Sequence, residues 1–342
     1  MASPFTSGNL TSVLVLHAGA LGDFVLTYHM LARLRSQCPV PRMDVVARSP
    51  LAKWTAGRGV IDGASDYEGF GLEQLFVEPP DADMPMAEKL RAYDLVLSFL
   101  GGDESLPASA MRRAGLTALH VDPRPTPETL RSRRHITEQW RDALLDRDWP
   151  GRPHPGTELR IHDGERQAAN ARFTSMLGTD RRPRIIVHPG SGSRTKSCPM
   201  EKLECVVAAL RDHGCGVLWM VGPTELDWYG PEWVVRLRRF APVVYEEDVP
   251  SAATLVAGAD RYLGHDAGMT HVAAAVGVET VVLFGPTDPN VWRPLGPRVT
   301  VISGGETFER VDPGQLVGAL IRQSLRKITK IRSSVSSPQR KR

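Results

Sequence analysis

The segment Arg261 to Asn290, RYLGHDAGMTHVAAAVGVETVVLFGPTDPN, is the clearest indication of the fold of this 342-residue chain. It contains a short strand, a glycine-containing turn, a helical segment of small residues at Met269–Gly277, and a β-branched strand at Thr280–Phe284. Strand, crossover helix and strand form one βαβ unit of a parallel sheet. The turn opens onto a helix N-terminus, where free backbone N–H groups and the helix dipole favour an anion such as a diphosphate. The pattern predicts a parallel α/β sheet with a phosphate-binding turn.

Asp266 and Gly268 lie in this turn, and the pattern leaves two interpretations of the carboxylate open. Asp266 can cap the following helix, a role that contributes about 1 kcal/mol to stability. Alternatively, it belongs to a ligand site at the helix N-terminus. Many α/β proteins place Asp or Gly before a helix for structural reasons, so the stretch taken alone favours capping.

Upstream, the second half of the chain alternates apolar strands with helical segments. Predicted strands at Ile185–Val187 and Gly216–Val221 end in the loops Pro189–Lys196 and Gly222–Glu225. Parallel sheets bind ligands outside the carboxyl ends of their strands, so these loops and the segment Gly264–Thr270 should converge. The sequence predicts one site built from three loops.

These loops carry groups suited to a nucleotide diphosphate. Ser191 and Ser193 offer hydroxyls, and Lys196 offers a positive charge, to phosphate oxygens. Glu225 can accept hydrogen bonds from ribose hydroxyls, as an acidic residue does in dinucleotide sites. The structural alternatives are a surface lysine at position 196 and a solvent-exposed helix-start residue at position 225.

The first half of the chain is also α/β. A buried-type strand at Ser12–Leu16 leads through the loop His17–Gly22 into an amphipathic helix at Asp23–Gln37. Asp23 stands at the start of this helix, where it is either an N-cap or a carboxylate directed at a cleft. Further predicted elements are strands at 43–47, 94–99 and 116–121, and helices at 104–114 and 127–145.

The α/β alternation lies on both sides of a Pro- and Gly-rich segment, Trp149–Thr157, which we interpret as a linker. Two similarly wound domains with a cleft between them are therefore predicted. The expected boundaries are residues 1–160 for the N-terminal domain, 161–325 for the C-terminal domain, and 326–342 for a basic tail.

Composition is ordinary for a globular protein, with 42% hydrophobic and 24% charged residues. No apolar run approaches the roughly 20 residues that span a bilayer. The N-terminus lacks the basic and apolar regions of a secretory signal, so we expect a cytoplasmic protein.

The cysteines form no CxxC pair and have no nearby His at ligand spacing, so free thiols without a disulfide or metal site are expected. These cysteines are Cys38, Cys198, Cys205 and Cys215.

The tail from Arg326 to Arg342 carries seven basic residues and no acidic one, although the whole chain has a formal net charge of only +3. Such Ser-rich basic tails are usually solvated. The functional alternative is peripheral attraction to anionic lipid at the inner face of the membrane, at about 1 kcal/mol per basic residue. No aromatic residues alternate with these charges, so no nucleic-acid partner is expected.

Four segments in order along the chain resemble a known family. They are GALGDFVLT (19–27), HPGSGSRTKSCPMEKL (188–203), VGPTEL (221–226) and YLGHDAGMTHVAAAVGVETVVLFGPTDPNVWRPLG (262–296). They resemble the motifs of the ADP-heptose:lipopolysaccharide heptosyltransferase family, glycosyltransferase family 9. The resemblance implies a GT-B fold of two Rossmann-like domains, a donor-binding C-terminal domain, an acceptor-side N-terminal domain, and inverting transfer without a metal or other cofactor. It also implies that the last helix, Pro313–Leu325, crosses back to the N-terminal domain.

Residue by residue, the resemblance implies that Asp23 is the general base, Lys196 lies near the donor phosphates, and Asp266 lies at the sugar. Glu225 matches the glutamate expected near the ribose, and backbone N–H groups of Gly268 and Met269 would meet the diphosphate. The residues carried over as donor-binding are Ser191, Ser193, Lys196, Glu225, Asp266, Ala267, Gly268, Met269 and His271.

The chain departs from the family's pattern at several positions. His29 replaces a common proline, and the usual K-x-W-P reads Lys196-Ser197-Cys198-Pro199, without its aromatic side chain. The family's N-D-S-G reads His265-Asp266-Ala267-Gly268. His265 and His271 lie on apolar segments and are expected to be packed or hydrogen-bonded, and Trp219 and Trp292 to form core or cleft wall.

The predicted function is transfer of a heptose or related sugar from a nucleotide-diphosphate donor, ADP-heptose by the resemblance, to a hydroxyl of a lipopolysaccharide-core or other glycan acceptor. Two alternatives remain open at this point. A nucleotide-sugar epimerase would bind the same donor without an acceptor, and a catalytically silent member would bind a nucleotide or a partner protein.

Overall fold

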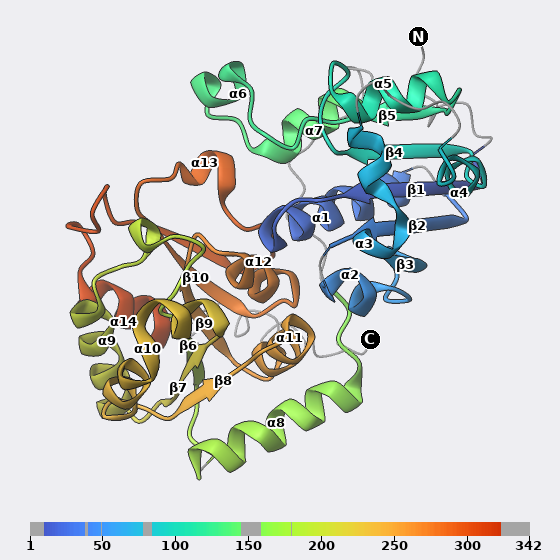
Figure 1. Ribbon diagram of the computed structural model, residues 1–342. Coiled ribbons are helices and arrows are strands. Elements are labelled where there is room, and N and C mark those ends of the chain that lie inside the picture. The colour runs from blue at the N-terminus through green and yellow to red at the C-terminus, as the bar shows by residue number, and fades with distance from the viewer. Residues whose placement is uncertain are drawn as a thin grey trace, which may run out of the picture.

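The computed structural model describes residues 10–37, 40–48, 50–77, 84–144, 159–178 and 180–322. Two lobes, each built on one β-sheet, lie against each other (Figure 1). The first sheet has five strands in the order β3-β2-β1-β4-β5, and the second has six in the order β11-β10-β9-β6-β7-β8. All the strand pairings among these residues are parallel. The predicted α/β class is confirmed.

The first lobe comprises β1 (Ser12–His17), α1 (Leu21–Gln37), β2 (Arg42–Ala47), α2 (Pro50–Thr55), β3 (Gly63–Asp66), α3 (Tyr67–Phe70), the 3₁₀ helix η2 (Leu72–Phe76), α4 (Ala87–Arg91), β4 (Leu95–Phe99), α5 (Leu106–Arg113), β5 (Ala118–His120), α6 (Pro127–Ser132) and α7 (Ile136–Leu144). The second comprises α8 (Asp163–Leu177), β6 (Arg184–Val187), the 3₁₀ helix η3 (Arg194–Lys196), α9 (Met200–Asp212), β7 (Gly216–Val221), α10 (Pro223–Arg238), β8 (Val243–Tyr245), α11 (Val249–Ala257), β9 (Arg261–His265), α12 (Gly268–Ala275), β10 (Glu279–Phe284), α13 (Pro289–Trp292), β11 (Val299–Ser303) and α14 (Pro313–Ile321).

The central strands are buried along their length because helices cover both faces of each sheet. β7 is buried at every position, which explains its continuous apolar sequence GVLWMV. The predicted βαβ unit is present as β9, α12 and β10, with His265 of β9 paired in register with Leu283 of β10. The carboxyl end of β9 therefore delivers Asp266 and Gly268 to the edge of the sheet where the other loops also emerge.

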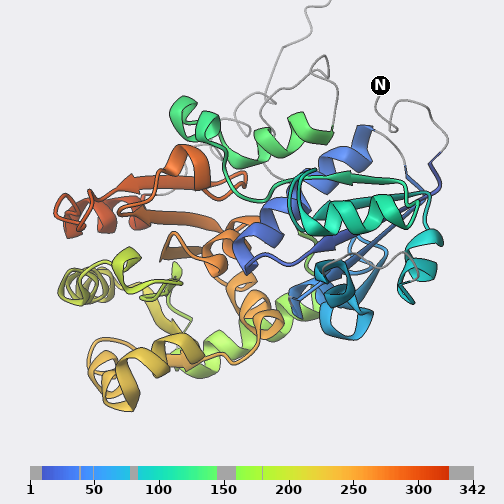
Figure 2. The same cartoon turned by 45° about the horizontal axis from the view of Figure 1, so that its top comes forward.

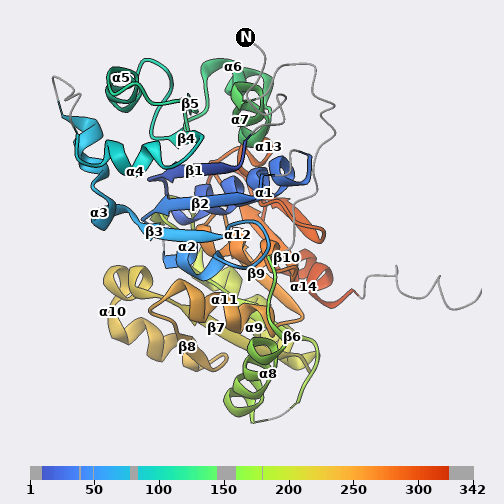
Figure 3. The same ribbon diagram turned by 90° about the vertical axis from the view of Figure 1, so that its right-hand side faces the viewer.

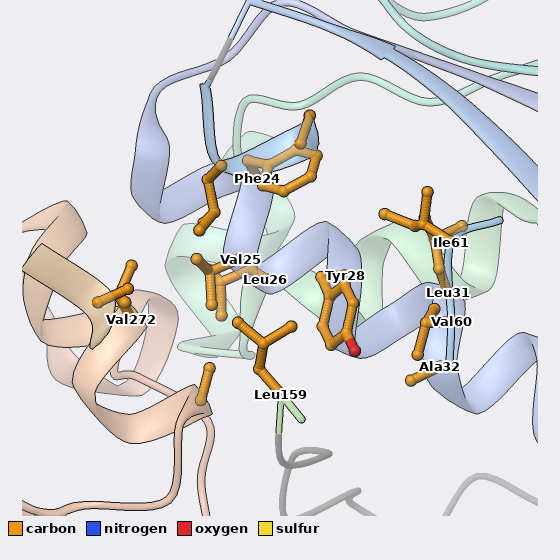
Figure 4. Close-up of a cluster of buried hydrophobic side chains, with 14 of the residues drawn as sticks. Phe24, Val25, Leu26, Tyr28, Leu31, Ala32, Val60, Ile61, Leu159 and Val272 are labelled. Carbon is orange, nitrogen blue, oxygen red and sulfur yellow. The ribbon is translucent and has the colours of Figure 1, made fainter. Parts of the chain in front are cut away.

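The two lobes meet where α1 packs against α12. Figure 3 shows these helices between the sheets, and Figure 2 shows the blue α1 again beside the orange part of the second lobe. Val25, Leu26 and Tyr28 of α1 form one buried cluster with Val272 of α12 and with Leu159 (Figure 4). The backbone N–H of Leu159 also donates to the carbonyl of Ala275 at 2.6 Å. A shared apolar core thus joins the lobes behind the cleft.

An ion pair fixes the start of α8 against the first lobe. Nη1 and Nη2 of Arg58 donate to the two carboxylate oxygens of Glu165 at 2.8 and 2.6 Å. The guanidinium lies over the Trp54 ring, 4.1 Å from its centroid, and Nη1 also donates to the carbonyl of Arg160. A bidentate, half-buried pair of this kind restricts the geometry of the chain as it enters the second lobe.

Some elements differ from the sequence-based expectation or were missing from it. The helix predicted at 127–145 is two helices, α6 and α7, separated at Arg133, whose φ of 51° is left-handed and ends α6. The helix that the pattern indicates at Pro231–Phe240 is the second part of α10, which begins at Pro223, directly after β7, and is kinked at Gly230. β3 and α4 were not predicted, because their short segments have too little periodicity to stand out.

The last described helix, α14, packs against α9 in the second lobe. The predicted crossing of the segment up to Leu325 to the first lobe stays a prediction, because residues beyond 322 lie outside the described part of the chain. Cys38, the linker Trp149–Thr157 and the basic tail also lie outside it. Cys198, Cys205 and Cys215 are free thiols, as predicted. Among the described residues, no helix is both long and apolar enough to cross a bilayer.

Candidate active site

The three predicted loops converge at the carboxyl edge of the second sheet, where they line a pocket of about 320 Å³. The pocket also takes in the loop before α1, so both lobes contribute to it. From the second lobe it is lined by His188, Ser191, Gly192, Met220, Val221, Gly222, Pro223, Thr224, Glu225, Glu246, Glu247, Asp248, Val249, Ala252, Ala267, Gly268 and Met269; from the first, by Ala20, Leu21 and Gly22. Of the predicted donor-binding residues, the pocket includes Ser191, Glu225, Ala267, Gly268 and Met269.

The N-termini of α1 and α12 face each other across the junction of the lobes. A Cβ placed on Gly268 would lie 2.7 Å from Cβ of Leu21, and one on Gly22 would lie 3.2 Å from Cδ2 of His271. Glycine at both positions therefore permits the close approach of the two backbones. Two sets of free N–H groups and two positive helix ends point at the same region, which favours a negatively charged ligand.

Asp266 forms an ion pair instead of a helix cap. The N-cap of α12 is Ala267, and no side chain caps this helix. Oδ2 of Asp266 accepts hydrogen bonds from Nζ of Lys196 at 2.9 Å and from Oγ1 of Thr287 at 2.8 Å. The capping interpretation of Asp266 is wrong, because the carboxylate turns away from the helix towards a lysine 70 residues distant. Lys196 is likewise not a free surface lysine.

Asp23 lies in the first turn of α1, near the Lys196–Asp266 pair. The backbone N–H of Ala20 donates to its Oδ2 at 3.3 Å. Burial raises the pKa of Asp23, the Ala20 amide lowers it, the charge of Asp266 raises it, and Lys196 lowers it; the net direction is upward. Both charges of the Lys196–Asp266 pair in the second lobe therefore lie within electrostatic range of this first-lobe carboxylate. A carboxylate with a raised pKa, next to a cleft, is suited to general-base chemistry.

The raised pKa of Asp23 also predicts that its ionisation costs folding free energy. Below the pKa of the unfolded state, the carboxyl group is protonated in both the folded and the unfolded protein, so this cost is absent. The cost grows as the pH rises and is complete once the pH exceeds the pKa of the folded state. The variant Asp23→Asn should therefore be more stable than the wild type at pH 7, and this advantage should vanish near pH 3. Urea unfolding at both pH values measures it. An asparagine variant less stable at pH 7 would show instead that favourable contacts hold the ionised carboxylate.

Glu225 is buried, with only 3% of its surface exposed, so the structural alternative of a solvent-exposed helix-start residue is wrong. Its Oε2 accepts the Gly222 N–H at 2.8 Å, and its Oε1 lies 3.6 Å from Nε2 of His188. Burial alone would raise the pKa of Glu225, but the His188 imidazole and the Gly222 amide bring it below its usual range. The carboxylate is therefore ionised on the pocket wall, where it can accept hydrogen bonds from hydroxyl groups.

The remaining predicted residues occupy supporting positions. Oγ of Ser191 donates to the Ser193 carbonyl at 2.5 Å, and the Ser193 hydroxyl lies 2.9 Å from that of Thr195, so these serines shape the loop. His271 is buried and its pKa is lowered to about 4 by burial, which keeps the ring neutral. His265 is buried and hydrogen-bonded, as expected. Trp219 is a fully buried core residue.

Sequence reasoning missed two parts of the site. Thr287 holds Asp266, and its place in the quoted GPTDPN segment was the available signal. The segment Glu246–Asp248 lines the pocket after the short strand β8. Glu246 is fixed there by Arg172 at 2.5 Å and by the Ser251 hydroxyl at 2.6 Å. No motif marked this segment; its place directly after the strand at Val243–Tyr245 was the available signal.

A second contact between the lobes lies beside the site. Nε and Nη2 of Arg133, at the α6–α7 corner, donate to the two oxygens of Asp288 at 2.7 and 3.0 Å, and Nε2 of His135 lies 2.9 Å from the carbonyl of Arg293. Figures 1 and 3 show α7 and α13 as neighbours. Asp288 directly follows Thr287, whose hydroxyl donates to Asp266, so this interlobe contact lies next in the chain to a residue that holds the Lys196–Asp266 pair.

The Arg133–Asp288 pair should stabilise the arrangement of the lobes seen in the structure by a small, salt-sensitive amount. The Arg133 side chain is 62% exposed, and such surface pairs contribute about 0 to 1 kcal/mol. Arg133→Gly removes the side chain and suits the left-handed backbone. Interlobe distances from small-angle scattering should increase in this variant at low salt and match the wild type in about 1 M salt, where charges are screened. A difference that persists at high salt would contradict the electrostatic origin.

Comparisons with known proteins identify the family of the chain. The model of glycosyltransferase family 9 (heptosyltransferase) matches residues 117–313. "Lipopolysaccharide heptosyltransferase 3" of Escherichia coli strain K12 is 27% identical over 113 residues, which cover 32% of this chain and 33% of that protein. The chain thus aligns with about a third of the length of this curated relative.

Solved structures share the fold. The structure of E. coli ADP-heptose lps heptosyltransferase II matches with a TM-score of 0.70 at 19% identity, over 90% of this chain and 97% of that chain. A family 9 glycosyltransferase from Veillonella parvula matches at 0.69 and 19% identity, over 90% and 95%. E. coli heptosyltransferase WaaC with ADP matches at 0.63 and 20% identity, over 90% and 98%. The predicted GT-B fold is confirmed.

Proposed function

Because this chain belongs to glycosyltransferase family 9 (heptosyltransferase), we propose that it moves a heptose or related sugar from a nucleotide-diphosphate donor to a hydroxyl of a lipopolysaccharide-core glycan, with inversion. The chain is a glycosyltransferase; the donor, acceptor and mechanism are the proposal. The observation that carries it is Asp23 of one lobe beside the Lys196–Asp266 pair of the other, at two facing helix N-termini.

We place the nucleotide in this pocket, against the wall that the second lobe contributes. The ribose hydroxyls would donate to Glu225, and the base would lie between the apolar wall at Met220 and Val249 and the acidic segment Glu246–Asp248. An exocyclic amino group, such as that of adenine, can donate to acceptors there. ADP bound to a relative of the same fold supports ADP as the nucleotide.

The proposed reaction is one displacement at the anomeric carbon. The acceptor oxygen forms a bond to this carbon while the bond to the diphosphate oxygen breaks, and the nucleoside diphosphate departs. Asp23 accepts the proton of the acceptor hydroxyl, a contribution of about 10²- to 10⁴-fold to the rate. Attack from the side opposite the leaving group inverts the anomeric configuration.

Positive charge for the departing diphosphate would come from Lys196 and from the N-terminus of α12 at Gly268. Because these two groups would balance the negative charge of the departing diphosphate, we propose that transfer requires no metal ion. Asp266 would hold Lys196 by its 2.9 Å contact and accept from a sugar hydroxyl. Closure of the lobes would exclude water and protect the donor from hydrolysis.

A transfer assay tests the proposal. Purified protein, ADP-heptose and a deep-rough lipopolysaccharide core should release ADP and yield a heptosylated core of inverted anomeric configuration, by mass spectrometry and NMR. A donor panel with other sugars and bases identifies the preferred donor, with thermal shifts to report binding. ADP-heptose converted without an acceptor would favour an epimerase, and binding without either product would favour a silent member.

The basic tail 326–342 is proposed to hold the enzyme at anionic lipid, near a lipid-linked acceptor. The full chain should sediment with vesicles containing anionic lipid, and a chain ending at Leu325 should not. Equal sedimentation of the two would remove the proposal. The inner face of the membrane and the cytoplasm follow as the proposed location.

A further inference from the structure

Two departures from the family's pattern, His265 and Cys198, contact each other. The backbone N–H of Cys198 donates to Nε2 of His265 at 3.0 Å, and Nδ1 of the same ring lies 3.3 Å from the carbonyl of Gly190. Because Nε2 accepts, the proton of the neutral ring belongs on Nδ1, which donates to Gly190. His265 is fully buried and Cys198 is 4% exposed, so both hydrogen bonds are shielded from water.

These two bonds lie at the two ends of the loop Gly190–Cys198. Inside the loop, the backbone N–H of Lys196 donates to the Ser193 carbonyl at 3.0 Å. The Lys196 side chain then returns to Asp266, the residue that follows His265 in the chain. At the end of β9, the His265 ring therefore holds both ends of the loop. The carboxylate of the next residue, Asp266, holds the Lys196 side chain.

The Gly190 end of the loop also touches the Glu225 carboxylate. A Cβ on Gly190 would lie 1.8 Å from Oε1 of Glu225, so the carboxylate packs directly on this glycine. If the Gly190 backbone shifted, it would displace the Glu225 carboxylate. If Cys198 shifted, it would displace Lys196, which lies two residues before it in the chain. Phe308 closes the other side of the ring in an edge-on contact with a centroid distance of 5.8 Å. The imidazole is held on all sides by protein atoms.

We propose that His265 is a positioning residue that holds Lys196 and Glu225 at the donor's diphosphate and ribose by anchoring Cys198 and Gly190. The assignment of these groups to the donor rests on the proposed function, whereas the anchoring itself does not. Burial lowers the pKa of His265 to about 4, so the ring stays neutral and keeps both bonds at physiological pH.

Three substitutions separate the two bonds. His265→Gln keeps an acceptor near the position of Nε2 for Cys198, His265→Asn keeps a donor near Nδ1 for Gly190, and His265→Phe keeps the ring but neither bond. The matched control is Thr280→Val, a fully buried residue at the other end of the same sheet whose hydroxyl donates to the Val278 carbonyl at 2.9 Å. It removes one buried hydrogen bond without touching the loop.

Calorimetry with ADP should show about tenfold weaker binding for His265→Phe, because the loss of about 1.4 kcal/mol of positioning is a factor of ten. The Gln and Asn variants should be intermediate, and Thr280→Val should bind ADP like the wild type. In the transfer assay, KM for the donor should rise while KM for the acceptor stays unchanged. ADP affinity within twofold of wild type in His265→Phe, or an equal loss in Thr280→Val, would overturn the proposal.

Two measurements need no nucleotide. ¹⁵N NMR of the wild type should show a protonated Nδ1 and a bare Nε2 for His265. Amide exchange at Cys198 should be slow in the wild type and in His265→Gln, and fast in His265→Asn and His265→Phe. An Nε2–H tautomer, or slow exchange in all four proteins, would refute the anchoring. If the wild type does not bind ADP, the proposed function fails, and these two measurements alone decide the role of His265.

Discussion

Replacing Asp23 by asparagine is expected to lower kcat by about 10²- to 10⁴-fold and to leave ADP affinity within about twofold of the wild type. The reason is that Asp23 belongs to the first lobe, whereas Glu225, Lys196 and Gly268, the proposed nucleotide contacts, belong to the second. Asparagine keeps the size of the side chain but cannot accept the acceptor's proton. Asp23→Ala should lose turnover to a similar extent. An undiminished turnover in either variant would refute the assignment of the base.

The pH dependence of the transfer rate is a second test of Asp23 as the general base. A general base must be deprotonated, and burial and Asp266 raise the pKa of Asp23. The acid limb of the wild-type rate should therefore lie above the range usual for an aspartate, and it should be absent from the residual rate of Asp23→Asn. Asp44→Asn is the matched control, since Asp44 is a buried carboxylate of the same lobe that accepts from Tyr93 at 2.7 Å. It should keep both the turnover and the acid limb.

Replacing Lys196 by methionine should weaken ADP binding by about 10- to 100-fold and lower kcat as well. Hydrogen bonds to charged groups contribute about 1.5 to 3 kcal/mol, and charge on the diphosphate grows as the bond to the sugar breaks. Calorimetry with ADP and turnover with a saturating donor measure the two effects separately. Unchanged ADP affinity would contradict contact between Lys196 and the diphosphate.

Removing Lys196 also leaves Asp266 without its cation, and a second variant separates this effect from lost phosphate contact. The double variant Lys196→Met/Asp266→Asn no longer contains an unpaired carboxylate. Its folding stability should therefore be higher than that of Lys196→Met, while its ADP binding should stay weak. Lys202→Met is the matched control, because Nζ of Lys202 donates to the carbonyls of Phe308 and Val311 at 2.8 and 2.9 Å, within the same lobe. It should lose stability and keep ADP affinity.

Much of the fold was predictable from local pattern. The strands at the centre of each sheet are buried on both faces, so their apolar runs stand out, and the βαβ unit at Arg261–Phe284 was found almost at its observed bounds. The elements that were missed or misjudged are short or end on unusual backbone. A non-glycine residue with a left-handed φ, such as Arg133, carries no sequence signal for the break it makes between α6 and α7.

The sequence indicated candidate residues for the site, but not their partners. Asp23, Lys196, Glu225 and Asp266 were singled out from loop position and from the resemblance to the family. Pattern alone nevertheless favoured a capping role for Asp266 and allowed an exposed Glu225. The structure reverses both, with Asp266 paired to Lys196 and Glu225 3% exposed.

By itself, the sequence determined where strands give way to helices, and therefore at which edge of each sheet the polar loops emerge, because hydrophobic periodicity and glycine position are local properties of the chain. Only the tertiary structure decided which groups meet. Lys196 and Asp266 are 70 residues apart, Cys198 and His265 are 67 apart, and Leu21 and Gly268 come from different lobes. Such pairings depend on crossovers and on the packing of whole elements, so the charge and hydrogen bonding of each group follow from distances that no local pattern contains.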